Sequence, residues 1–245
     1  MKKVLAMLLV LALAVSMIAC TQKGGNDSAA EVTGMTKAEY DAAAVDTEVE
    51  VVTYVQAKQG WWENEGVGMA TFYTQAKDGA YFLYNMPCSK EDYDKMTEGT
   101  QLKVKGFKSE WSGEVEIIDA TYEILDGKYV ADALDATSLL GTDDLIKHQN
   151  EKVSFTGLTV EAANEAGDAF LYNWDGSGSQ GNDLYFNVSV NGQTYTFTVE
   201  SYLCGPDTDV YKTVEGLKVG DTIDVQGFLY WYEGAQPHVT GVTVK

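Results

Sequence analysis

The sequence predicts an all-β protein with short helices, built as two tandem five-stranded Greek-key barrels, each with one helix between its third and fourth strands. Two observations predict this: a motif that occurs twice, and the same order of alternating strands around each copy. The length of 245 residues suits two domains of about 100–120 residues each. Apolar residues make up 45% and aromatic residues 11% of the chain, which is enough to build a core.

The repeated motif is G-x4-V-x-G-F-x5-G, at residues 99–113 and again at 220–234. A tryptophan falls between the last two glycines of each copy, Trp111 and Trp231. Upstream, a two-residue hairpin signal typical of a type I′ turn precedes each copy, Asp78-Gly79 and Asn191-Gly192. A cysteine and then a tyrosine follow each hairpin, first Cys88 and Tyr93, then Cys204 and Tyr211. Matching features in the same order indicate an internal duplication.

The alternation of apolar and polar residues places five strands in the first copy, at 48–59, 67–76, 80–87, 102–107 and 114–122. Ser89-Lys-Glu-Asp92 resembles a capping box and predicts a short helix to about Met96. A second capping box, Thr36-Lys-Ala-Glu39, predicts a lead-in helix over 36–44.

The second copy gives the same order, with strands expected at 152–161, 184–190, 194–202, 222–230 and 238–244. Its helix is expected over 207–215, and a longer insertion, 170–182, precedes its hairpin. A lead-in helix is expected over 143–149. The link from Asp126 to Thr142 is apolar enough to pack against the barrels.

Five strands with one helix between the third and the fourth is the element order of the OB-fold. A β-sandwich is the alternative, and the helix at the same place in both copies argues against it. The chain resembles bacterial lipoproteins with tandem OB-like domains, most clearly at Tyr54–Trp62 and Gly106–Ile117 and over about residues 47–245. This resemblance implies a fold and a surface location, and it implies almost nothing about a ligand.

The N-terminal segment predicts a lipid anchor. Met1-Lys2-Lys3 is basic, residues 4–18 are apolar or small, and the segment ends Met17-Ile18-Ala19-Cys20, which resembles a bacterial lipobox. Residues 1–19 are therefore read as a lipoprotein signal peptide and 20–35 as a tether, with Cys20 lipidated and the protein held outside the cytoplasm. The alternative is an ordinary signal peptide with an incidental cysteine. The domains expected are 36–126 and 142–245, each with its lead-in helix, joined by a linker at 127–141.

Charge disfavours phosphate backbones as partners. The net charge is −20, and all 17 basic residues are lysine. Residues 45–126 hold 7 lysines and 16 acidic residues, and residues 150–245 hold 4 and 13, so each barrel carries −9. Nucleic-acid readers rely on basic side chains, often arginine. The one basic cluster of the body, Lys103, Lys105 and Lys108, is interpreted as a solvated strand face rather than a phosphate track.

No catalytic, metal or cofactor site is expected. The two histidines, His148 and His238, have no Cys or His neighbour at metal-ligand spacing. Gly176-Ser177-Gly178-Ser179 is no nucleophile elbow, and residues 175–183 depart from the EF-hand pattern. Cys88 and Cys204 either pair or remain as two separate buried thiols, and separate thiols are favoured.

Aromatic residues are the candidate binding residues, because the groove of an OB-fold binds its ligand beside strands 2 and 3. Those most expected to be exposed are Trp61, Trp62, Trp174, Tyr230 and Tyr232. The predicted function is a non-enzymatic, lipid-anchored binding protein whose ligand is a protein or a glycan. Two alternatives remain: single-stranded nucleic-acid binding, which the charge disfavours, and a structural spacer or assembly subunit.

Overall fold

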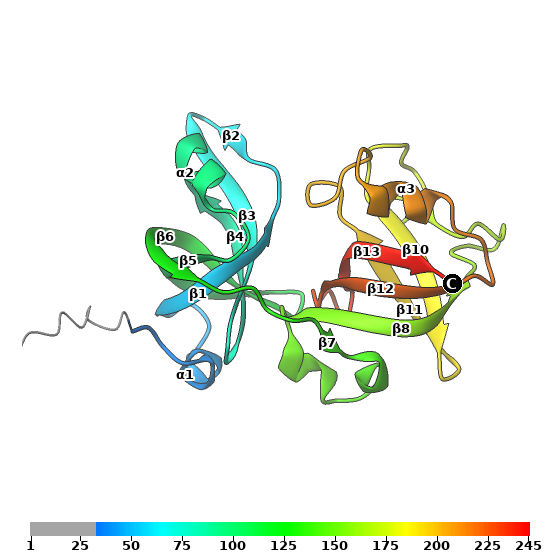
Figure 1. The fold of residues 1–245 in the computed structure, drawn as a ribbon, viewed down its shortest axis with the longest axis horizontal. Helices are drawn as coiled ribbons and strands as arrows, with labels where there is room; N and C mark the ends of the chain where they lie inside the picture. The colour runs from blue at the N-terminus through cyan, green and yellow to red at the C-terminus, as the bar shows by residue number, and fades with distance from the viewer. Residues whose placement is uncertain (1–32) are drawn as a thin grey trace, which may run out of the picture. The chain divides into compact units, whose positions relative to one another are not determined.

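Figure 1 shows two β-sheets that follow one another along the chain, the first drawn in blue to green and the second in green to red. The computed structural model describes residues 33–245. The predicted signal peptide, Cys20 and nearly all of the predicted tether lie outside these residues and stay predictions. Within the described residues, no helix is long and apolar enough to cross a membrane. Both sheets belong to one unit, Val32–Lys245, and the domain boundaries near residues 126 and 142 stay predictions.

The first sheet is a five-stranded ring. Its strands are hydrogen-bonded in the order β1-β5-β6-β4-β3, and a further pairing of β1 with β3 closes the ring. β4 and β6 pair in parallel. A helix, α2 (Lys90–Lys95), lies between β4 and β5 in the chain, and a short strand, β2 (Trp62–Asn64), pairs with the edge of β3. The ring strands are β1 (Glu48–Lys58), β3 (Val67–Ala76), β4 (Gly79–Pro87), β5 (Thr100–Trp111) and β6 (Glu114–Lys128).

The second sheet has the same topology. The order is β8-β12-β13-β11-β10, closed by a pairing of β8 with β10, and β11 and β13 pair in parallel. A helix, α3 (Asp209–Glu215), lies between the third and fourth strands, and two short strands, β7 (Leu134–Asp135) and β9 (Leu171–Tyr172), flank the ring. Two five-stranded OB-type barrels are therefore confirmed. The ring strands are β8 (Lys152–Glu161), β10 (Leu184–Val190), β11 (Gln193–Val199), β12 (Thr222–Phe228) and β13 (His238–Val244).

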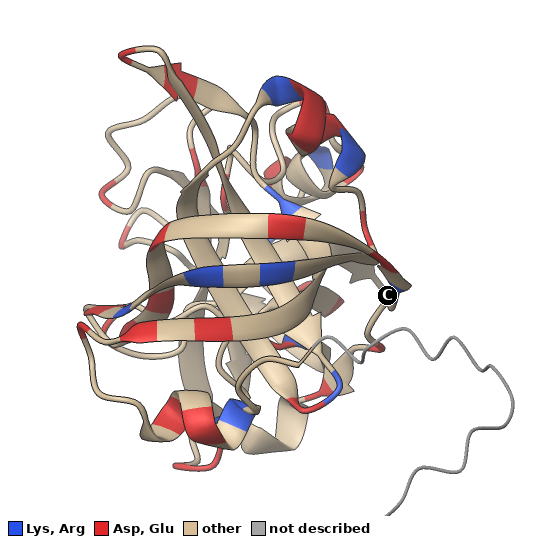
Figure 2. Cartoon of the chain, turned by 90° about the vertical axis from the view of Figure 1, so that its left-hand side faces the viewer, with Lys and Arg blue, Asp and Glu red and all other residues tan. Residues whose placement is uncertain are grey.

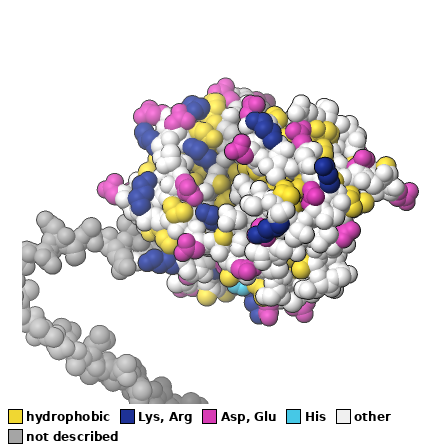
Figure 3. Space-filling view, turned by 45° about the vertical axis from the view of Figure 1, so that its right-hand side comes forward, with side chains coloured by type: hydrophobic (Ala, Val, Ile, Leu, Met, Phe, Trp, Pro, Cys, Tyr) yellow, Lys and Arg dark blue, Asp and Glu magenta, His cyan; other side chains and the backbone are white. Residues whose placement is uncertain are grey.

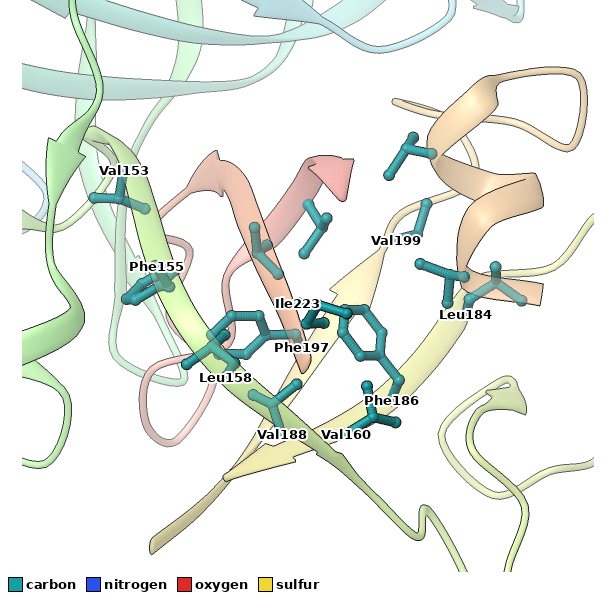
Figure 4. Close-up of a cluster of buried hydrophobic side chains, with 14 of the residues drawn as sticks. Val153, Phe155, Leu158, Val160, Leu184, Phe186, Val188, Phe197, Val199 and Ile223 are labelled. Carbon is teal, nitrogen blue, oxygen red and sulfur yellow. The ribbon is translucent and has the colours of Figure 1, made fainter. Parts of the chain in front are cut away.

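Each barrel has its own core, because alternate side chains of every strand point inward. Figure 4 shows the second core, where Phe155, Phe186 and Phe197 meet between the strands. Truncating one such phenylalanine to alanine costs about 3–5 kcal/mol. Cys88 and Cys204 are buried free thiols, one in each core, which confirms the expectation of separate thiols.

The middle glycine of the repeated motif has a structural explanation. Gly106 and Gly227 each lie beside a register shift in the pairing with the next strand. A Cβ at Gly106 would lie 2.7 Å from the Ile118 carbonyl oxygen, and a Cβ at Gly227 would lie 2.2 Å from that of His238. Only glycine fits this close backbone approach, so this part of the motif is structural.

Two local expectations need correction. The helix expected over 143–149 is a 3-10 turn, η2 (Leu145–His148), whose N-cap residue Asp144 makes no side-chain cap hydrogen bond and pairs with Lys147. Asn191 (φ 53°) and Gly192 (φ 78°) fit a type I′ turn. The first hairpin does not, since Asp78 has no positive φ and its carboxylate accepts the Lys37 N–H at 2.8 Å.

The helix α1 (Lys37–Ala42) begins at a complete capping box formed by Thr36 and Glu39, as expected. Its buried Tyr40 packs on Tyr81 in the first core.

The lysines of the basic cluster on β5 bind partners within this barrel. Figure 2 shows basic positions on one strand beside acidic positions on its neighbours. Lys103 and Lys105 pair with Glu50 and Glu48, both at 2.9 Å. The buried Lys108 ammonium donates to the carbonyls of Tyr40, Asp41 and Ala43 at 2.8–3.0 Å.

Candidate functional site

A cleft of about 1040 Å³ lies over the outward faces of both barrels. In an OB-fold the ligand groove is formed by strands 2 and 3 and by the loops that follow strands 1 and 4. In the second barrel these parts are β10, β11, the segment after β8 and the segment between β12 and β13, and each contributes residues to the cleft. The cleft therefore coincides with the groove that the topology predicts.

Three cross-strand pairs of β10 and β11 form one wall. The register sets Asn187 opposite Thr196 and Tyr185 opposite Thr198. Asp183 and Glu200 follow as the next pair on the same face, beyond the ends of the two strands. All six residues line the cleft. Residues two apart on a strand share a face, so this wall follows directly from the alternation of the second hairpin.

The first barrel supplies the opposite wall with four aromatic rings. Phe82 and Tyr84 lie on β4, Trp62 lies on β2, and Trp111 ends β5. In the OB-fold, β4 is the third strand, β2 lies in the loop after the first strand, and Trp111 lies at the loop after the fourth strand, so the same parts line the groove in this barrel. The Trp111 ring lies 5.1 Å from the ring of Tyr232, which belongs to the second barrel. The grooves of the two barrels thus share one cleft.

Exposed aromatic side chains gather at this cleft. Among the described residues, seven aromatic side chains are largely exposed, and six of them line the cleft. Trp174 is 76% exposed and Tyr202 is 72% exposed. Exposed apolar side chains are common singly, but a cluster of them marks an interaction site. The six are Trp62, Tyr84, Trp111, Trp174, Tyr202 and Tyr232, and Phe107 is the one that lies elsewhere.

Buried aromatic residues from both barrels support the cleft. Tyr73, Phe82 and Phe228 form a separate buried cluster, with Tyr230 packed against it. The Tyr73 hydroxyl lies 2.6 Å from Nδ1 of His238, and the Tyr230 ring stacks on the His238 ring at 4.0 Å. Burial lowers the pKa of His238 to about 3, so the imidazole is neutral at physiological pH. His238 therefore brings no positive charge to the cleft.

Apart from the neutral His238, the cleft has no basic side chain, and its two acidic groups are the carboxyl groups of Asp183 and Glu200. Asp183 Oδ1 accepts from the N–H and the hydroxyl of Ser201, at 2.8 and 2.6 Å. Burial and the neighbouring Asp183 raise the pKa of Glu200 to about 7. Elsewhere acidic side chains are scattered, as on the face in Figure 3. In the part of the chain that the structure describes, no group of His, Cys, Asp and Glu is arranged to hold a metal ion.

Four of the five sequence-predicted binding residues line the cleft: Trp62, Trp174, Tyr230 and Tyr232. Trp61 does not, because its ring covers Gly68 and its indole N–H donates to the Cys88 carbonyl at 3.1 Å. That the four bind a ligand stays a prediction.

Sequence reasoning missed the exposed rings of Tyr84, Trp111 and Tyr202 as binding residues. For Trp111 a signal existed, because the repeat places it at the same loop position as Trp231. The two positions differ in the structure, since Trp231 packs partly against the second core. No pattern in the sequence marks Tyr202, which lies in the turn after β11.

No family model and no curated protein matches the sequence. Solved structures share low identity with it. A murine DNA-binding protein bound to double-stranded DNA shares 13% identity over 80% of this chain and 94% of its own, with a TM-score of 0.35. The p204 HINb domain shares 10% identity over 83% of this chain and 100% of its own, with a TM-score of 0.36. A deletion mutant of the single-stranded DNA-binding protein from Thermus aquaticus shares 12% identity over 81% of this chain and 93% of its own, with a TM-score of 0.28. TM-scores this low carry no information about the ligand of this chain.

Proposed function

We propose that the chain is a non-enzymatic carbohydrate-binding protein, held outside the cytoplasm by a lipid on Cys20, with the cleft as its glycan site. The observation that carries the proposal is the gathering of six exposed aromatic rings in one cleft that has no basic side chain.

The chemistry of the lining suits sugars. Sugar rings offer apolar faces that stack on aromatic rings, and their hydroxyl groups need hydrogen-bonding partners around the rim. The cleft provides such partners in the side chains of Gln59, Asn85, Asn187 and Gln236. Its volume of about 1040 Å³ lies at the upper end of the range for small-molecule sites, which favours a chain of several sugars over a single one.

A glycan array probed with the purified full-length chain tests this proposal. We expect binding to a defined set of oligosaccharides, and about 5- to 150-fold weaker binding by Trp174→Ala and by Trp111→Ala, because a stacked ring contributes roughly 1–3 kcal/mol. Phe107→Ala is the matched control, since Phe107 is an exposed aromatic residue away from the cleft. Absence of glycan binding, or equal losses in all three variants, contradicts the proposal.

Single-stranded nucleic-acid binding is the second candidate. The observation in its favour is that the exposed rings lie in OB grooves, where successive bases can stack. Against it, phosphates would find no cationic partner among the lining residues. A fluorescence titration with a single-stranded oligonucleotide at low salt separates the two candidates. Tight binding that Trp174→Ala abolishes, without glycan binding, would establish the second candidate in place of the first.

A further inference from the structure

One end of the cleft carries two adjacent carboxylates without a counter-ion. Asp183 and Glu200 follow the last paired residues of β10 and β11, Leu184 and Val199. Neither forms an ion pair with any residue that the structure describes. Both Ser201 donors bind Oδ1 of Asp183, which leaves Oδ2 open to a ligand. The Leu203 N–H donates to Oε2 of Glu200 at 2.8 Å.

A buried hydroxyl beside these carboxylates also lacks a partner. Thr198 lines the cleft two residues before Glu200 on the same face of β11, and it is 2% exposed. Its Oγ1 makes no hydrogen bond within the described residues. Few buried polar groups in folded proteins lack a partner, so the Thr198 hydroxyl is an unfilled hydrogen-bonding position.

Aromatic rings complete the surroundings of the carboxylates. Tyr185 lies opposite Thr198, and burial, followed by the charges of Asp183 and Glu200, raises the pKa of its hydroxyl to about 12. A cation beside aromatic faces is attracted by the ring quadrupoles. An ammonium group also offers three hydrogen-bond donors to acceptors such as carboxylates and a threonine hydroxyl.

We infer that this end of the cleft selects a positively charged amino group on the ligand, so that the preferred glycan is an amino sugar with a free amine. The inference rests on the proposed carbohydrate-binding function and deepens it. A primary ammonium supplies the charge that the two carboxylates lack and a donor for the unpaired hydroxyl. A neutral sugar in the same place supplies no counter-charge for Asp183 or for Glu200 in its ionised form.

The test compares two pentasaccharides that differ at the amine: the β-1,4-linked glucosamine pentamer and its fully N-acetylated counterpart, titrated by calorimetry against the full-length chain. We expect the free amine form to bind at least tenfold more tightly. Asp183→Asn and Glu200→Gln keep the size of each side chain and remove its charge. Each variant should lose most of this preference while its affinity for the acetylated pentamer changes less than about twofold.

The control for general attraction to an acidic protein is Glu123→Gln, which removes a charge from an exposed residue of β6 away from the cleft. It should keep the full preference. Equal binding of the two pentamers, or a preference that survives in both cleft variants, overturns the inference and leaves carbohydrate binding standing. Absence of binding to either pentamer, together with a blank glycan array, overturns the proposed function itself.

Discussion

Replacing Glu114 with glutamine should make the stability of this protein less sensitive to alkaline pH. Glu114 is fully buried where the barrels meet, and its Oε2 accepts the Trp231 N–H at 2.9 Å. Glu114 Oε1 and Asn150 Oδ1 are also buried, and neither has a hydrogen-bond partner among the residues that the structure describes. Because Glu114 Oε1 is buried without a donor, the neutral carboxyl is favoured over the carboxylate, and a glutamine side chain keeps the size without a titratable group.

The magnitude follows from the pKa of Glu114, which burial raises from its ordinary value of 4.5 to about 8. The folded state then holds more protons than the unfolded state between these values, so the stabilisation is complete below pH 4.5 and is lost as the pH rises through about 8. At roughly 1.4 kcal/mol for each unit of pKa difference, the loss between pH 5 and pH 9 is about 4 kcal/mol. Glu116 and Glu200, whose pKa values burial raises to about 7, add losses of the same sign.

Urea unfolding followed by tryptophan fluorescence at pH 5, 7 and 9 measures this effect. We expect Glu114→Gln to match the original protein at pH 5 and to be more stable at pH 9. Glu123→Gln, at an exposed position of the same strand, should follow the original protein at every pH. A Glu114→Gln protein whose unfolding free energy falls with pH as steeply as the original would refute the reasoning.

Three further substitutions are expected to change stability. Lys108→Met should destabilise the first barrel by about 3 kcal/mol in thermal unfolding, because the carbonyl oxygens of Tyr40, Asp41 and Ala43 at the end of α1 lose three charge-assisted hydrogen bonds from the ammonium. Gly227→Ala should cost about 3 kcal/mol or more and shift the amide NMR signals of β12 and β13, since its Cβ would overlap the His238 carbonyl. Thr198→Val should leave stability unchanged or raise it by about 1 kcal/mol, because the lost hydroxyl has no partner, while weakening binding of the glucosamine pentamer in calorimetry.

Much of the fold follows from local signals in the sequence. The bounds of β8, β10 and β13 agree with the alternation of apolar residues, and the duplication supports each assignment with a second copy. The helix expected at residues 143–149 is present only as a 3-10 turn, Leu145–His148, whose N-cap residue Asp144 makes no capping hydrogen bond. The lengths of β5 and β6 were underestimated, since their outer ends pair with one another beyond the apolar core.

The candidate site was harder to predict, because it depends on contacts between distant parts of the chain. Alternation shows that about half of the strand aromatics face outward, but it does not show what lies opposite them. Tyr73 and His238 meet although 165 residues separate them, and Trp111 lies against Tyr232. The choice between Trp61 and Trp62 depended on whether Gly68 leaves room for a ring, which the sequence does not reveal.

The shared cleft makes the two copies of the repeat interdependent. Either barrel alone would present one open groove, whereas residues of both barrels line the single cleft seen here. A ligand that contacts both walls also holds the barrels against each other. Under the proposed function, the binding free energy of such a ligand would add to the free energy that separates the docked barrels from the undocked ones, so saturating ligand should make their separation less favourable.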